Sequence, residues 1–431
     1  MSINSGKMSL FTATMLNINV IIGAGILLNP PIMAGLAGNV SFLGWILCGI
    51  IFFPLVWGAA EASKLWAGQA GFYTFGKKGL NEGAGFVAGW TYFIAYLGTP
   101  VGHLLGLRAV LATQFHWRFV VEHPLLFNAF YVVVLSLLTF LSIKVVSAIQ
   151  NSSTIIKLIP LLTVIFLFVF YFNPNFILDF QCIPVLGATL PLTVFAFLGF
   201  EVGCNVSHLV EGGQKNAARA LFYGFYIVLA LYTLFHFGLL QIMGAENLAT
   251  FGGAAFPQFL GIKSVAIVAL LKALIAATFV VTYVSASYGI FIGNSTLLRG
   301  MAEEKVFPGS AFIAQHNRND RPWVAICCQA LGVFILSVMI QDMSAMSFVV
   351  LFVLPAMIIM FIALLKSNNQ TIARQLFSLA GLISCCILGY FSWIGLGSTM
   401  DIRITNLTPG ILIFAFGLAM YILQKRITKK A

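Results

Sequence analysis

Residues 21–31 of the chain read IIGAGILLNPP, and they lie in the middle of the first long apolar stretch. Glycine costs about 0.8–1 kcal/mol relative to alanine inside a helix, so Gly23 and Gly25 favour local unwinding. Irregular backbone at membrane depth is tolerated only where it is buried in protein or lines a water-filled cavity. The N–H groups at the start of the second half-helix would attract a carboxylate. We therefore predict a binding site at this break, formed by Ile22, Gly23, Ala24, Gly25 and Ile26. Close packing between helices is the alternative role for such small residues.

The composition excludes a water-soluble fold. Of the 431 residues 60% are hydrophobic and 8% are charged, whereas a soluble domain carries about 25% charged residues. The chain holds about 12 mostly apolar stretches of the length that crosses a bilayer. We predict an all-α polytopic membrane protein with one transmembrane domain over residues 1–431. The expected spans are 9–36, 41–66, 84–113, 124–143, 153–172, 185–208, 218–243, 263–298, 322–341, 345–365, 372–396 and 406–424.

The formal net charge of +11 is explained by topology. With the N-terminus inside, most lysines and arginines fall in cytoplasmic connections, and the opposite side keeps Arg118, Lys263 and Arg403. This asymmetry follows the positive-inside rule. It predicts a multi-pass protein of the plasma membrane, the inner membrane of a bacterium, with both termini cytoplasmic. The basic balance therefore indicates orientation in a lipid bilayer and no nucleic-acid partner.

A second interruption occurs in the sixth stretch, where residues 198–203 read LGFEVG. Interrupted spans at corresponding positions of two halves are the best sequence indication of a transporter's substrate site. We therefore expect a first repeat over about 9–172, a second over about 185–365, and extra helices over about 372–424. The pattern favours a membrane transporter with a central anionic or zwitterionic ligand.

Motifs in the same order along residues 15–330 resemble the amino acid–polyamine–organocation (APC) superfamily. The matching segments are GAGI at 23–26, AE at 60–61, GFY at 71–73, GFVAGW at 85–90, FAFLGFE at 195–201 and RP at 321–322. The resemblance implies a LeuT-like fold, with a 5+5 inverted repeat and two C-terminal helices. It also implies a midplane site between spans one, three, six and eight. Residues 66–70 depart from the family pattern and leave the substrate open.

Few acidic side chains lie inside a span. A buried carboxylate there usually marks a substrate or proton path, so we assign Glu201 to coupling or gating. A neutral acid hydrogen-bonded to carbonyls of the broken helix is the alternative. Glu61 lies three residues before Lys64, which favours a local ion pair, and a gate residue is the second interpretation. His103 is mid-span and could relay protons.

Lys157 is expected about four residues into the fifth span. From position alone its ammonium would snorkel to the interface. The resemblance implies another role, since some relatives place a lysine where sodium-driven members bind a sodium ion. We therefore predict that Lys157 takes part in coupling and that transport does not need sodium.

Aromatic and small residues complete the predicted substrate site. Two tyrosines four apart in the third span share one helix face, and two phenylalanines flank the second break, where they could close over a ligand. Packing in the core is the alternative for all four rings. The substrate ammonium would face freed carbonyls at this break. These residues are Tyr92, Tyr96, Phe195, Ala196, Phe197 and Gly199.

The sequence therefore predicts secondary active transport of amino acids or related amines by alternating access, without sodium and with proton coupling or exchange. The alternatives are a polyamine antiporter, an amino acid exporter, an uncoupled facilitator and a sensor that does not transport. Seven cysteines without CxxC spacing and the lack of a catalytic constellation indicate neither an enzyme nor a metal or other cofactor. The identity of the substrate and the formation of a homodimer stay open.

Overall fold

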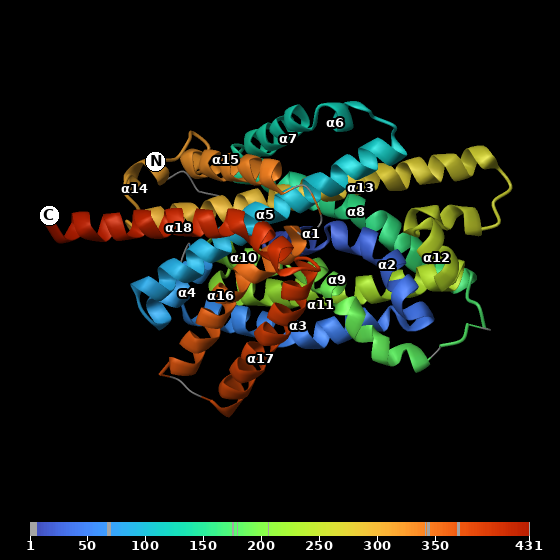
Figure 1. Ribbon diagram of the computed structural model, residues 1–431, viewed down its shortest axis with the longest axis horizontal. Coiled ribbons are helices and arrows are strands. Elements are labelled where there is room, and N and C mark those ends of the chain that lie inside the picture. The colour runs from blue at the N-terminus through green and yellow to red at the C-terminus, as the bar shows by residue number, and fades with distance from the viewer. Residues whose placement is uncertain are drawn as a thin grey trace.

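The computed structural model describes residues 7–66, 70–174, 176–178, 180–205, 207–340, 342, 345–368 and 371–430, and these residues form helices without strands (Figure 1). The segment expected to form the first repeat, about 9–172, contains α1 (Leu10–Ile21), α2 (Ala24–Ala37), α3 (Leu43–Leu65), α4 (Gly71–Gly79), α5 (Glu82–Gln114), α6 (Phe119–Glu122), α7 (Pro124–Thr139) and α8 (Ile143–Phe170).

The described residues after α8 also form helices. It contains α9 (Leu190–Phe197), α10 (Val202–Asn205), α11 (Gly213–Met243), α12 (Ala245–Phe251), α13 (Val265–Glu303), α14 (Ser310–Ile313), α15 (Trp323–Met339), α16 (Ala345–Lys366), α17 (Ile372–Gly395) and α18 (Met400–Lys430). Short 3₁₀ helices are η1 (Gly38–Val40), η2 (Phe180–Thr189), η3 (Ser207–Leu209) and η4 (Gly253–Phe259).

The predicted all-α polytopic membrane fold is confirmed. Within the described residues, nine helices are long and apolar enough to cross a membrane, and the bent pair α1–α2 makes a tenth. Two shorter apolar helices, α7 and α15, lie where the fourth and ninth spans were expected. Polar residues begin several of the helices. Ser9, Ser264 and Thr371 each accept a hydrogen bond from a first-turn N–H, which satisfies a donor that the helix itself leaves free.

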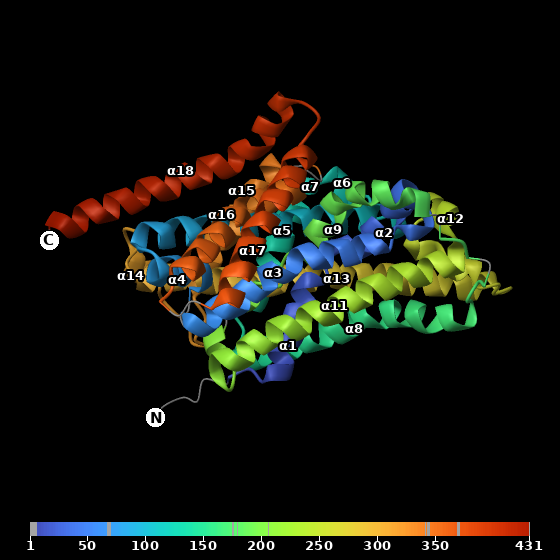
Figure 2. The same cartoon turned by 90° about the horizontal axis from the view of Figure 1, so that it is seen from below.

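The interrupted helices occupy the centre of the bundle. Helix α1 lies against α8, α11 and α13, while α5 lies against α4, α13 and α16. The C-terminal helix α18 runs along the outside (Figure 2). Helices α4 and α14 lie at one end of the bundle and α12 at the other (Figure 2). The central position of α1 and α9 keeps both breaks away from lipid.

Helix α8 begins at Ile143 and not near residue 153 as expected. Two polar residues near the expected start, Gln150 and Thr154, face α1. Gln150 and Thr154 are buried, and the Thr154 hydroxyl lies 3.3 Å from the Met15 carbonyl oxygen. Polar residues that find partners on a neighbouring helix can stay inside a membrane helix. As a result Lys157 lies in the middle of α8, far from the helix end that the sequence suggested.

Candidate functional site

The first break separates α1 from α2, which are bent by 45°. Ile22 has ψ 85°, and Gly23 has φ −116° and ψ −144°, so neither residue is helical. Helix α2 begins at Ala24, whose side chain lies outside the described part of the structure. The N–H groups of this first turn have no preceding helical turn to accept their hydrogen bonds. Gly25 and Ile26 lie in that turn and are buried.

The second break lies between α9 and α10. Helix α9 ends at Phe197, Leu198 is extended, and Gly199 has φ 109°. Glycine enters this left-handed region readily because it has no Cβ. A Cβ on Gly199 would also lie 2.7 Å from Val20 Cγ1. The glycine therefore allows both the turn and its close approach to α1.

The two breaks touch each other. A Cβ on Gly25 would overlap the side chain of Ala196 and would lie 2.7 Å from its Cα. Tyr232 on α11 spans both, because its hydroxyl lies 2.8 Å from the Ile21 carbonyl oxygen and 3.3 Å from that of Ala196. Gly25, Ala196 and Tyr232 are buried, so the space between the breaks is closed in this conformation. Tyr232 was not among the residues predicted from the sequence, because a tyrosine in an apolar span carries no distinguishing pattern.

Lys157 reaches the first break from α8. Its side chain is fully buried, and its ammonium donates to the carbonyl oxygens of Asn19 and Ile22, both at 2.8 Å. These carbonyls belong to the last turn of α1 and the break, where the helix leaves acceptors free and carries its negative dipole end. A cation is stabilised at such a site. The alternative, in which the Lys157 ammonium extends to the membrane interface, does not describe this buried position.

A polar cluster beside that lysine joins three helices. The Asn19 amide donates to Gln150 of α8 and, at 2.9 Å, to the Ser285 carbonyl of α13. The Ser285 hydroxyl donates back to the Asn19 side-chain oxygen at 3.1 Å. Single polar residues in separate spans gave no signal that they would meet. The cluster anchors the end of α1 to α8 and α13.

Glu201 lies in the turn of the second break and is fully buried. It accepts hydrogen bonds from the Tyr96 hydroxyl and from the Gly199 N–H, the latter at 3.2 Å. The Tyr96 ring stacks on Tyr92 with centroids 4.5 Å apart, and Tyr92 stacks on Phe72 at 4.8 Å. The two tyrosines of α5 thus share a face, as expected, and Tyr96 connects that face to the break. In this conformation the Glu201 carboxyl is shielded from water.

The two phenylalanines of α9 have different surroundings. Phe197 is enclosed by aromatic rings, among them Trp45 at 6.1 Å and Phe52 at 5.7 Å between centroids. Phe195 faces α5, since its ring lies 3.8 Å from where a Cβ on Gly102 would be. Phe197 therefore packs in the core, and Phe195 is the ring that lies against α5. His103, also on α5, lies next to Gly23.

The sequence matches the family model described as amino acid permease over residues 8–423. It is 25% identical to the serine/threonine exchanger SteT of Bacillus subtilis over 97% of both chains. It is 29% identical to the arginine/agmatine antiporter of Chlamydia felis over 54% of this chain and 53% of that protein. It is 25% identical to the putrescine transporter PotE of Escherichia coli over 51% of each. The chain belongs to the amino acid permease family. It is a multi-pass membrane transporter and not an enzyme, and the resemblance to the APC superfamily is confirmed.

Glu61 of the permease connects α3 to α17. Its carboxylate lies 2.6 Å from the Arg374 guanidinium and 3.4 Å from the Lys64 ammonium. The expected pair with Lys64 is present, but the shorter contact is with a residue that is distant in the chain. The Glu61 and Arg374 side chains are 18% and 10% exposed, so this pair is mostly shielded from water.

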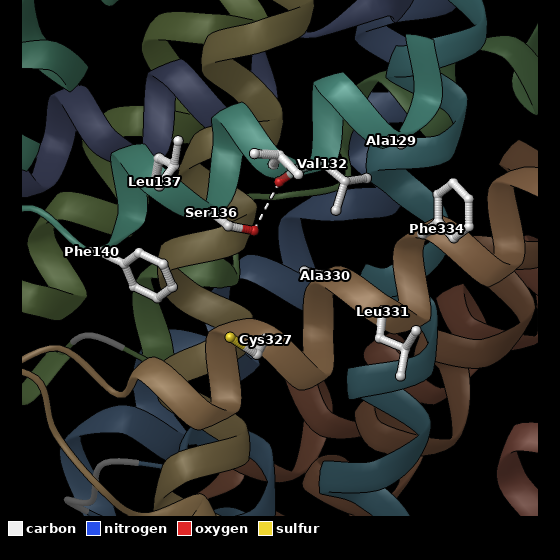
Figure 3. A pocket seen from close by; sticks show the side chains of 10 residues that line it. Ala129, Val132, Ser136, Leu137, Phe140, Cys327, Ala330, Leu331 and Phe334 are labelled. Atoms are coloured by element: carbon white, nitrogen blue, oxygen red, sulfur yellow. Dashed lines mark hydrogen bonds between the residues drawn. The ribbon is translucent and has the colours of Figure 1, made fainter. Parts of the chain in front are cut away.

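One apolar pocket of about 450 Å³ lies between α7 and α15 (Figure 3). Its walls include Val132, Leu137, Leu331 and Phe334. The Ser136 hydroxyl points to the Val132 carbonyl of its own helix at 2.8 Å, so it is already satisfied. Among the described residues the wall holds no charged side chain, and besides Ser136 its only polar side-chain group is the weakly polar Cys327 thiol, so this pocket does not fit a zwitterion. The breaks remain the candidate substrate site of the permease.

Proposed function

We propose that the permease carries amino acids or related amines across the bacterial inner membrane by alternating access. The substrate carboxylate would bind the N–H groups at the start of α2, and its ammonium would bind carbonyl oxygens at the end of α9. The observation that carries this proposal is the direct contact of two broken helices in the buried centre of the bundle, at Gly25 and Ala196. Two helix ends of opposite polarity there match the two charges of an amino acid.

The coupling we propose is independent of sodium, by proton movement or exchange. Lys157 already places a cation on carbonyl oxygens of the first break, and Glu201 places a carboxyl on the second. The relatives include the serine/threonine exchanger SteT and an arginine/agmatine antiporter. Because agmatine and putrescine, named for two of these relatives, are amines, an amine antiporter is the second candidate.

The orientation we propose puts both termini in the cytoplasm. Lys77 and Lys78 lie in α4 and Lys305 shortly before α14, at the end of the bundle where α18 also finishes (Figure 2). Lys263 lies in the connection that precedes α13. This connection lies near α12, at the opposite end of the bundle from α4 and α14 (Figure 2). An excess of basic residues marks the cytoplasmic side. We also propose inverted repeats over about 9–172 and 185–365, each opened by a broken helix, with α17 and α18 outside them.

Uptake into proteoliposomes tests this function. Radiolabelled standard L-amino acids and polyamines are offered to vesicles that are empty or preloaded, in sodium or choline buffer at fixed pH. We expect uptake of at least one amino acid, faster with preloading or an inward proton gradient, and equal in the two buffers. Flux that no gradient stimulates would indicate an uncoupled facilitator. Absence of counterflow would indicate a sensor that does not transport. Loss of uptake in choline would contradict the role of Lys157.

A further inference from the structure

A line of hydrogen bonds reaches the first break from α7 and α13. His103 Nδ1 lies 2.9 Å from Ser287 Oγ, and the Tyr131 hydroxyl donates to the same Ser287 oxygen at 2.6 Å. All three side chains are buried. The other ring nitrogen, His103 Nε2, lies 2.7 Å from where a Cβ on Gly23 would be. The imidazole thus occupies the space that a side chain at position 23 would fill, beside the start of α2.

The direction of these hydrogen bonds determines where the imidazole carries its proton. The Tyr131 hydroxyl has one hydrogen, and its alternative acceptor, the Tyr283 carbonyl, is 3.5 Å away. The short contact to Ser287 is therefore the one that uses it. Within the described residues the Ser287 hydroxyl has no acceptor besides His103 Nδ1, so we assign its hydrogen to that contact. In a neutral imidazole one nitrogen accepts and the other donates, so Nε2 carries the N–H.

The surroundings favour the neutral ring. The Lys157 ammonium is bound to the Ile22 carbonyl, immediately before Gly23. A second buried cation at the same break would cost far more than a neutral ring with a satisfied nitrogen. The imidazole therefore presents one fixed donor, the Nε2–H, toward the break.

We propose that His103 donates its Nε2–H to the carboxylate of the transported amino acid and so selects substrates that have one. The inference rests on the proposed function, in which that carboxylate lies at the first turn of α2. The backbone N–H groups of that turn would bind one side of the carboxylate, and His103 would bind it from α5. Ser287 and Tyr131 act as positioning residues, because they hold the tautomer and touch no substrate.

The test measures how strongly each of two ligands competes with uptake, in the wild-type protein and in variants. One is the standard L-amino acid with the highest wild-type uptake, and the other is the amine in which hydrogen replaces its carboxylate. His103→Leu removes the donor, whereas His103→Gln keeps an amide N–H near the Nε2 position. We expect His103→Leu to weaken the amino acid at least about tenfold, which is 1.4 kcal/mol, and the amine much less. His103→Gln should restore most of the difference.

His236→Leu is the matched control, because His236 is a buried histidine on α11 that accepts the Trp45 indole N–H at 3.0 Å. It should change the affinities of both ligands by the same factor. If His103→Leu does not fold, Ser287→Ala carries the test, with a smaller loss expected for the amino acid alone. Equal losses for both ligands, or none, would overturn the role of His103 only. Wild-type uptake of amines alone would overturn the carboxylate contact, and uptake of neither would contradict the proposed function itself.

Discussion

Three buried polar side chains, those of Lys157, Glu201 and His103, bind the backbone or a neighbouring helix at the two breaks. Ionisable groups inside a membrane are costly, so they persist where they have partners and usually where they have a function. Each of the three lies on a different segment, and all three lie at the breaks that form the candidate site. Their individual roles can be separated by substitution.

Lys157→Met should lower the stability of the permease. It leaves the carbonyl oxygens of Asn19 and Ile22 without their donor, and each buried unsatisfied acceptor costs about 1–3 kcal/mol. Thermal unfolding in detergent measures the loss. Lys144→Met, at an exposed position of the same helix, is the control and should stay within about 0.5 kcal/mol of wild type. Equal stability of the two variants would show that the ammonium contributes little to the break.

Glu201→Gln should flatten the dependence of the transport rate on pH. Glutamine keeps hydrogen-bonding groups beside Tyr96 and Gly199 but cannot titrate. Substrate affinity should stay within about tenfold, or 1.4 kcal/mol. Initial uptake rates at several pH values between about 5 and 8 report the titrating group. The control is Glu246→Gln, at an exposed acid in the first turn of α12. Superimposable profiles for Glu201→Gln and wild type would make Glu201 a structural acid.

At the scale of elements, the two breaks depend on glycines at points of close approach. Gly199 adopts a backbone conformation with positive φ and lies against Val20. Gly25 has an ordinary position in the first turn of α2 but faces Ala196 of α9. Both glycines therefore allow α1–α2 to lie directly against the α9–α10 turn. In the proposed function, a substrate would have to separate these elements to reach the site.

Gly25→Val should abolish substrate binding while the protein still inserts in the membrane. A branched side chain would collide with Ala196 and cover the N–H groups of the first turn. Uptake and competition binding measure the effect. Gly187→Val is the control, because a Cβ on Gly187 would meet nothing within 4 Å. Wild-type affinity in Gly25→Val would exclude the break as the binding site.

At the scale of the whole molecule, an ion pair between Glu61 and Arg374 links two helices that are distant in the chain. The pair joins α3 to α17, and α17 also packs along α16. The ion pair joins the last turns of α3 to the first turn of α17, on the side that we propose to be cytoplasmic. It is therefore placed to hold these two helices together at that surface.

Arg374→Gln should destabilise the permease by about 1.5–3 kcal/mol, the usual contribution of a hydrogen bond to a charged group. Lys64→Gln should cost about 0–1 kcal/mol, because the Lys64 side chain is 47% exposed and its pair is a surface pair. Thermal unfolding of both variants, of Glu61→Gln, and of each variant combined with Glu61→Gln gives the two coupling energies. A larger coupling for Lys64 would assign the carboxylate to its local partner.

The all-α membrane fold, the two breaks and the face shared by Tyr92 and Tyr96 could be predicted because they depend on local properties. Apolar length, glycine content and helical spacing are visible within a window of the chain. The start of the fifth span was predicted wrongly, since α8 already begins at Ile143, and Gln150 and Asn151 find partners on α1. Burial on another helix is not visible in such a window.

What the sequence by itself determined is an all-α membrane protein with broken helices in its first and sixth spans. Only the tertiary structure decided which polar groups meet there. Lys157 and Ile22 are 135 residues apart, and Glu61 and Arg374 are 313 apart. It also separated Phe197, packed among aromatic rings, from Phe195, which faces α5. The physical reason is that a buried polar or aromatic side chain takes its role from its neighbours in space, and packing of distant helices chooses those neighbours.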